Sequence, residues 1–338
     1  MRGVRLGEPR GREPLPNRQP RSLLRMLDGL SRQDYPAERF EAIVVVDGRP
    51  AVAASLRELS FPFRFRVLEQ PAAGPAAARN RGVAEASEAY VLFLDDDVVP
   101  SPSLIARHAE AHTQPDVVAI GPLVAAALGS APPWTRWEWT TLQAQYRAME
   151  AGEWPPTPRQ FYTGNASVRR DDVLGAGGFD PAFRRGEDVE LAWRLYARGL
   201  RFVFDPLARA EHFAERSFDA WLAAAYEYGR TDVMLERIRT GHDLPGWVQR
   251  EFGRRHRYSR ALARVVLRRP EAWRVARPSG WLGMWSADRV GLAGAAGHMC
   301  SALFTAAYWR GVAAMLGRDR AVILTAAAAA APASGSAA

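Results

Sequence analysis

Residues 90–100 read YVLFLDDDVVP, and this stretch decides the fold. Five apolar or aromatic residues followed by three aspartates are typical of a buried strand that leaves the core at its carboxyl end. In an extended chain the side chains of Asp95 and Asp97 point the same way, and two parallel carboxylates suit a hard divalent cation. The alternative is a polar turn in which an aspartate caps the next helix.

Short strands and helices alternate on both sides of this stretch. Such alternation predicts an α/β chain with a doubly wound, mostly parallel sheet, whose ligands bind at the carboxyl ends of the strands. A Trp-rich stretch at 134–154 reads as less regular. The predicted strands are 41–48, 63–67, 90–94, 116–125, 161–170 and 201–204, and the predicted helices are 21–30, 53–59, 74–87, 104–112 and 186–199.

Composition excludes several classes of function. All 45 basic residues are Arg, so Schiff-base chemistry, pyridoxal phosphate enzymes and lysine-containing phosphate loops are excluded. The lone Cys300 excludes an intrachain disulfide and points to a reducing compartment. Ten Arg from Arg250 to Arg277 face only two acids, so the net charge of +8 belongs to one segment. We therefore expect no general nucleic-acid-binding surface and no nucleic-acid partner.

The chain divides into four parts. Residues 1–20 lack an apolar run and form an irregular segment without a visible signal peptide. Residues 21–240 carry the α/β pattern, 241–325 form an Arg-rich helical region, and the Ala-rich tail 326–338 is expected to be disordered.

Four further positions could carry chemistry. Glu187 and Asp188 open a helix, where acids also occur simply because they stabilise the helix dipole. His212 follows a strand and could bind a metal, although a lone histidine is more often structural. Asp47 ends a strand, as in an ordinary Asp-Gly turn, and Arg79 could pair with phosphate or belong to an Ala-rich packed helix.

The order of these motifs changes their interpretation. From residue 17 to 217 the chain runs through VVVDG, GPAAARNRG, FLDDDVVP, TGNASVRR, GEDVELAWRL and EHFAERS. This order closely resembles the inverting family-2 glycosyltransferases. The resemblance implies a GT-A-like α/β fold, with a doubly wound, mixed and mostly parallel sheet flanked by helices, here followed by a helical C-terminal extension.

The resemblance also implies the donor side of a site. Asp95 to Asp97 match the DxD element of the family, in which Asp95 faces the ribose and Asp97 holds Mn²⁺ or Mg²⁺ on the diphosphate of a nucleotide-sugar donor. Asp96 belongs to the same substrate-binding element. Asp47 falls in the nucleotide-contacting turn, and Arg79 lies near the donor.

On the acceptor side, the resemblance implies that Asp188 deprotonates the attacking hydroxyl, with Glu187 as the second choice. His212 matches a histidine that some members use as a further metal ligand beside Asp95 and Asp97. Gly164 and Asn165 border the donor sugar or the acceptor, which we expect to be a glycan or a lipid-linked hydroxyl compound of a cell-envelope pathway.

Two departures from the family pattern define an alternative. The apolar strand that normally begins the domain is reduced to Pro16, Asn17 and Arg18, and Val46 stands where an acid is common. The alternative is a non-catalytic binding or scaffold protein that has lost part of its nucleotide pocket.

The Arg-rich region predicts a location. From Tyr258 onward, Leu262, Val265 and Val266 share one helical face, with arginines along another. Such a helix suits an anionic membrane surface, where each basic residue contributes roughly 1 kcal/mol, or else packs on the catalytic domain. Residues 291–308 are long enough to span a membrane, but their Gly and Ala content favours a helix that lies in the membrane interface or packs against protein. We expect a cytoplasmic protein, peripheral on the inner face of the membrane.

Overall fold

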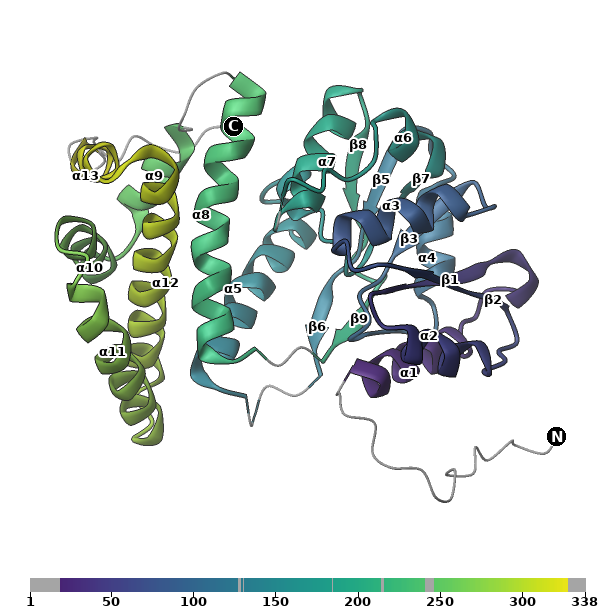
Figure 1. The fold of residues 1–338 in the computed structure, drawn as a ribbon, viewed down its shortest axis with the longest axis horizontal. Helices are drawn as coiled ribbons and strands as arrows, with labels where there is room; N and C mark the ends of the chain where they lie inside the picture. Colours follow the sequence, from purple (N-terminus) through teal and green to yellow (C-terminus); the bar gives the residue numbers. More distant parts are fainter. Residues whose placement is uncertain are drawn as a thin grey trace.

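The computed structural model describes residues 19–126, 129, 131–183, 185–213, 216–240 and 246–327. An α/β half and an all-helical half lie side by side, with α5 (Pro133–Glu150) and α8 (Phe218–Thr240) between the sheets and the outer helices (Figure 1). The tail from 328 and the N-terminal segment up to residue 18 lie outside the described residues, while α1 (Gln19–Leu30) already includes positions 19 and 20.

The described residues of the α/β half form three small sheets, one of them parallel and two mixed. Their strand orders are β1-β2, β3-β7-β5-β8 and β4-β9-β6. The mixed α/β class is confirmed, although the described pairings divide evenly between parallel and antiparallel. The strands are β1 (Glu41–Asp47), β2 (Arg64–Gln70), β3 (Tyr90–Phe93), β4 (Val98–Pro100), β5 (Val117–Ile120), β6 (Leu123–Ala125), β7 (Ala166–Arg169), β8 (Arg201–Phe204) and β9 (Ala210–His212).

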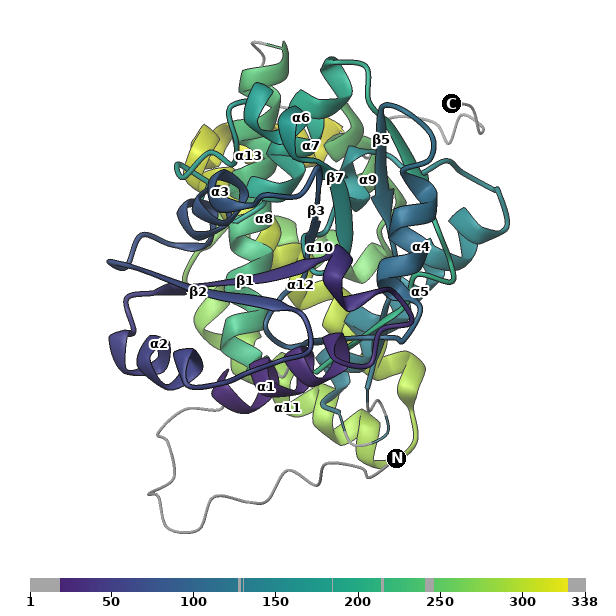
Figure 2. The ribbon, with the colours of Figure 1, turned by 90° about the vertical axis from the view of Figure 1, so that its right-hand side faces the viewer.

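Helices cover these sheets (Figure 2). Leu27 of α1 is fully buried in an apolar cluster with β1, and Leu191 of α7 is fully buried against β5 and β7. In the described residues β1 pairs with β2 alone, so its other edge joins no strand. Besides α1, these helices are α2 (Pro50–Arg57), α3 (Pro75–Glu85), α4 (Leu104–Ala111), α6 (Arg170–Gly175) and α7 (Glu187–Ala197), and the short 3-10 turns are η1 (Ala37–Arg39) and η2 (Pro158–Gln160).

The predicted strand 116–125 is in fact two strands in different sheets. Gly121 and Pro122 separate β5 from β6, and Pro122 has no backbone N–H to continue the first ladder. A Cβ on Gly121 would lie 2.1 Å from the carbonyl oxygen of Ala208, so the two chain segments approach more closely there than any side chain allows. Because of this break, one apolar run contributes β5 to one sheet and β6 to another.

The Trp-rich stretch is regular after all. Residues 133–150 form α5, an 18-residue helix with Pro133 in its first turn, where its missing N–H costs nothing. Trp134 and Trp139 are buried on it. The expectation of irregular structure was wrong because tryptophan content hid the helical spacing.

The helical half is built around α8 and α12. A Cβ on Gly229 would lie 2.0 Å from the carbonyl oxygen of Tyr308, and one on Gly311 would lie 1.9 Å from that of Tyr226, so glycines let the two helices touch backbone to backbone. None of the helices in the described residues is long and apolar enough to cross a bilayer. The other helices here are α9 (Gly246–Arg254), α10 (Arg257–Arg268), α11 (Ala272–Arg289), α12 (Ala293–Leu316) and α13 (Arg318–Ala327).

Candidate active site

Arg79 joins the two acidic motifs in one place. From α3, its Nη2 donates to Oδ1 of Asp95 at 3.1 Å, and its Nη1 donates to Oε1 of Glu187 at 2.6 Å. Asp95 stands where β3 leaves the core, and Glu187 begins α7. The aspartate cluster and the acid pair therefore lie on opposite sides of a single guanidinium, although 92 residues separate them in the sequence.

The surroundings of Arg79 keep its guanidinium protonated and paired with carboxylates. Its side chain is 21% exposed, and its guanidinium carbon lies 5.7 Å from the ring centroid of Phe179. Burial alone would lower the pKa of Arg79, but the charges of Asp95, Glu187 and Asp188 outweigh burial and raise it. The guanidinium that the sequence places near the donor is thus held by carboxylates.

Asp188 has the electrostatics of a base. Burial, reinforced by the charge of Glu187, raises the pKa of Asp188 to about 6. The backbone N–H of Val189 donates to its Oδ1 at 2.8 Å and fixes the carboxylate. Gly186 precedes α7 with φ of +78°, and a Cβ there would lie 2.6 Å from the methyl carbon of Thr231 in α8. A group that ionises near neutral pH in a fixed position can accept a proton from a hydroxyl.

Asp97 and His212 form a second pair. Nε2 of His212 lies 3.2 Å from Oδ1 of Asp97, because Val98 pairs directly with His212 across β4 and β9. Burial tends to raise the pKa of Asp97, but the hydrogen bond and charge of His212 lower it overall. The indole of Trp139 in α5 meets the imidazole edge to face at 5.5 Å between centroids. These contacts hold the carboxylate oxygen of Asp97 beside the ring nitrogen of His212.

The chemistry of this pair fits part of a metal site. Within the described residues, no three His, Cys, Asp or Glu side chains are grouped closely enough to hold an ion. Asp95 is turned to Arg79, and burial followed by the charges of Asp97 and Asp95 raises the pKa of Asp96. Asp97 and His212 therefore fit a divalent cation that takes its remaining ligands from other oxygens, such as those of a diphosphate.

Asp47 is occupied by the next turn. Its carboxylate accepts hydrogen bonds from Nε2 of Gln70 at 2.9 Å and from the backbone N–H groups of Ala73 and Gly74, both at 2.8 Å. Despite some desolvation, these bonds lower the pKa of Asp47. The side chain shapes the loop before α3, and its expected contact with a nucleotide stays a prediction.

Gly164 and Asn165 differ in what they offer. A Cβ on Gly164 would lie 3.2 Å from Oδ2 of Asp95, so glycine keeps the space beside that carboxylate open. Asn165 is 1% exposed and donates to the carbonyls of Pro122 and Ala208 while its Oδ1 lies 2.9 Å from Nε2 of His108. Its side chain is fully engaged within the protein.

Sequence reasoning missed several aromatic and basic groups beside the acids. Burial raises the pKa of Tyr162, and nearby groups that include Tyr228 and Asp188 raise it further, so Tyr162 lies close to both. Arg216 donates to Tyr228 and to Oε1 of Glu138, the latter at 2.8 Å. They come from separate loops and helices, so no local motif marks them.

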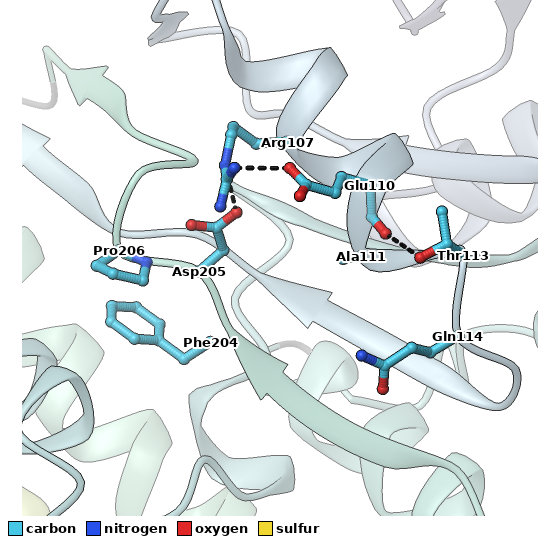
Figure 3. Close-up of a pocket in the computed structure, with 8 residues that line it drawn as sticks. All are labelled: Arg107, Glu110, Ala111, Thr113, Gln114, Phe204, Asp205 and Pro206. Atoms are coloured by element: carbon cyan, nitrogen blue, oxygen red, sulfur yellow. Dashed lines mark hydrogen bonds and ion pairs between the residues drawn. The ribbon is translucent and has the colours of Figure 1, made fainter.

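A surface hollow of about 350 Å³ lies elsewhere, lined by α4 and the residues that follow β8 (Figure 3). Arg107 there donates to Asp205 at 2.8 Å and to Glu110 at 2.6 Å. None of the predicted site residues lines this hollow, and its charges are paired internally.

The small sheets, with acids at the carboxyl ends of strands, define a GT-A-like fold. Residues 14–175 match the family described as Glycosyl transferase family 2, so this part of the chain is a family-2 glycosyltransferase domain. This confirms the resemblance carried by the motifs.

Two curated relatives are similar over more than half of this chain. The pre-mycofactocin glycosyltransferase of Mycobacterium tuberculosis is 29% identical over 236 residues, which is 67% of this chain and 50% of that protein. The validoxylamine A glucosyltransferase of Streptomyces hygroscopicus is 28% identical over 206 residues, covering 52% of this chain and 48% of that protein. The chain spans about half the length of the curated relatives it matches.

A solved structure shares the fold. The mannosyltransferase PcManGT from Pyrobaculum calidifontis, in complex with GDP-Man and Mn²⁺, superposes with a TM-score of 0.53 at 20% identity and covers 95% of this chain and 74% of that one. The match extends through the helical half.

Proposed function

We propose that the protein transfers a sugar from a nucleotide-sugar donor to an acceptor hydroxyl with the aid of a divalent cation and with inversion. The observation that carries the proposal is the bridge from Asp95 through Arg79 to Glu187, next to a carboxyl with a pKa of about 6. A donor-binding acid and a base thus face a common space. The names of the curated relatives support sugar transfer as the reaction class.

On the donor side, Asp95 binds the ribose, and Asp97 with His212 holds Mn²⁺ or Mg²⁺. The cation supplies charge neutralisation for the nucleoside diphosphate that leaves. Arg79 changes partner in this proposal: when the diphosphate is bound, its guanidinium can turn from carboxylates toward phosphate oxygens. Asp96 and Asp47 complete the nucleotide pocket, Asp47 by shaping the loop before α3.

On the acceptor side, Asp188 takes the proton of the attacking hydroxyl. Glu187 is paired with Arg79 and is therefore the weaker candidate for the base. Attack from the face opposite the leaving group inverts the anomeric centre. Gly164 leaves room beside Asp95 for the donor sugar. Asn165 has an indirect role, because its amide holds the loops that contain Pro122 and Ala208.

The test is a screen of nucleotide-sugar donors for hydrolysis and transfer in the presence of Mn²⁺ or Mg²⁺. Replacing Asp97 or Asp188 with Ala should reduce transfer by at least about 10³-fold. Asp171→Ala, at an exposed carboxylate of α6, is the matched control and should be fully active.

A fully active Asp188→Ala protein would rule out the base assignment. Calorimetry with nucleoside diphosphates and Mn²⁺ tests the alternative: a folded protein that binds none of them would be a non-catalytic relative.

We propose an anionic membrane surface as a further partner, reached through α10 and α11 at the outer edge of the helical half (Figure 1). Exposed arginines lie here among exposed apolar side chains, a combination that suits an anionic lipid surface. Vesicles containing phosphatidylglycerol should bind the protein, vesicles of phosphatidylcholine alone should not, and Arg268→Glu should weaken binding. The exposed groups are Arg257, Tyr258, Val265, Arg268, Arg269, Arg274, Val275, Leu282, Val290 and Leu292.

A further inference from the structure

A cation without a counter-charge lies near the base. Arg185 is half-buried just before α7, and its carbonyl accepts a hydrogen bond from Oγ1 of Thr231 at 2.6 Å. Its Nη1 is shielded from solvent and has no hydrogen-bond partner. Among the described residues no carboxylate pairs with this side chain. A shielded guanidinium that lacks its anion is a group that a ligand can satisfy.

An aromatic side chain fixes this guanidinium in place. The guanidinium carbon of Arg185 lies 5.2 Å from the ring centroid of Tyr228 in α8. The hydroxyl of Tyr228 accepts a hydrogen bond from Arg216, whose own charge acts on Asp97. Stacking leaves the in-plane N–H donors of Arg185 available, and those donors match the two oxygens of a carboxylate or phosphate.

The position of Arg185 and Tyr228 indicates that they belong to the acceptor side of the site. Arg185 precedes Asp188 by three residues, and Tyr162 lies close to Asp188 and also to Tyr228, the ring that the guanidinium of Arg185 contacts. The donor groups approach instead from α3 and the end of β3. An alcohol whose hydroxyl meets Asp188 would therefore extend toward Arg185.

Resting on the glycosyl transfer proposed above, we propose that Arg185, stacked on Tyr228, binds an anionic group of the acceptor, so that the natural acceptor is a hydroxyl compound carrying a carboxylate or a phosphate. The site selects among acceptors, and Asp188 carries out the proton transfer. Arg216 lies on the other edge of Tyr228, but its bond to Glu138 already satisfies it.

The first experiment compares three small acceptors that differ in charge: glycerate, glycerol 3-phosphate and glycerol. For the wild type, the ratio of transfer to donor hydrolysis should be higher for at least one anionic acceptor than for glycerol. Arg185→Met keeps much of the stacked volume and should reduce that preference roughly 30-fold, the size expected for a charge-assisted hydrogen-bonded pair. Arg209→Met, at an exposed arginine bonded within its own loop, should keep the preference.

The second experiment does not depend on turnover. With nucleoside diphosphate and Mn²⁺ saturating, calorimetry should show glycerate or glycerol 3-phosphate binding to the wild type and to Arg209→Met, and not to Arg185→Met. Glycerate and glycerol 3-phosphate together decide whether the site takes a carboxylate or a phosphate.

Equal losses with charged and neutral acceptors would reduce Arg185 to a structural role and overturn the proposal, as would a wild type that binds neither anion. Absence of donor hydrolysis by any variant would instead refute the proposed function, so the two failures are distinguishable.

Discussion

Replacing Asp188 with Asn should abolish sugar transfer and yet stabilise the protein at neutral pH. The pKa of Asp188 is raised by burial and by Glu187 from the usual 3.8 to about 6, so its carboxyl holds a proton more tightly in the folded than in the unfolded state. The folded state is therefore penalised wherever the carboxyl must ionise. The difference between the two pKa values corresponds to a loss of about 3 kcal/mol in the free energy of unfolding. This loss is absent below pH 4, develops between pH 4 and 6 and is complete above pH 6.

Asparagine removes this penalty while preserving the local hydrogen bond. Its amide oxygen can still accept from the backbone N–H of Val189, as Oδ1 of Asp188 does at 2.8 Å. For a chain of 338 residues, 3 kcal/mol corresponds to a rise in Tm of roughly 4 °C. The wild type should lose transfer activity as the pH falls through about 6, because the base must be ionised to accept a proton.

Thermal and urea unfolding of both proteins between pH 4 and pH 8 measures this effect. The gain in the free energy of unfolding of Asp188→Asn over the wild type should be near zero at pH 4 and level off above pH 6. Asp171→Asn, at an exposed carboxylate, should show no such gain. A variant with the same gain at pH 4 as at pH 8, or one less stable than the wild type at pH 8, would refute the electrostatic reasoning.

Three further substitutions test the remaining parts of the site. Gly164→Ala would place a methyl group 3.2 Å from Oδ2 of Asp95 and should raise the KM for the donor several-fold in steady-state kinetics, with little change in Tm. His212→Ala should raise the pKa of Asp97 and weaken Mn²⁺ affinity in the presence of nucleoside diphosphate by about 10- to 100-fold, as measured by calorimetry. Arg79→Met removes a charge that lowers the pKa of the general base, so the acidic limb of the pH–rate profile should move to higher pH; an unchanged limb would contradict this.

The sequence predicted those parts of the site that follow directly from strand ends and helix starts. An apolar run that stops at an acid must leave the core there, which places Asp47 and Asp95 correctly at the ends of β1 and β3. Acids next to Gly186 likewise predicted the start of α7. The carboxyl ends of parallel strands and the helix N-termini meet at one edge of such a sheet. The proximity of Asp95 and Glu187 therefore follows from the predicted fold class.

Other parts depend on contacts that no local pattern encodes. Asn165 falls in the predicted strand 161–170, where the sequence gives no sign that three separate segments converge on its amide and bury it. The short strands β4 and β9 are defined by pairing between distant segments, β4 with β9 and β9 also with β6. The helix α5 had a readable signal, since Trp139, Leu142, Tyr146 and Met149 recur at helical spacing, and the abundance of tryptophan obscured it.

The helix α8 contacts both the helical half and the candidate site. This helix packs along α12 through Gly229 and Gly311, yet its other face reaches the site. There Thr231 fixes the turn that precedes Asp188, and Tyr228 supports Arg185. Because α8 is held in turn by α12, we expect the position of the proposed base to depend on the packing of α8 against α12.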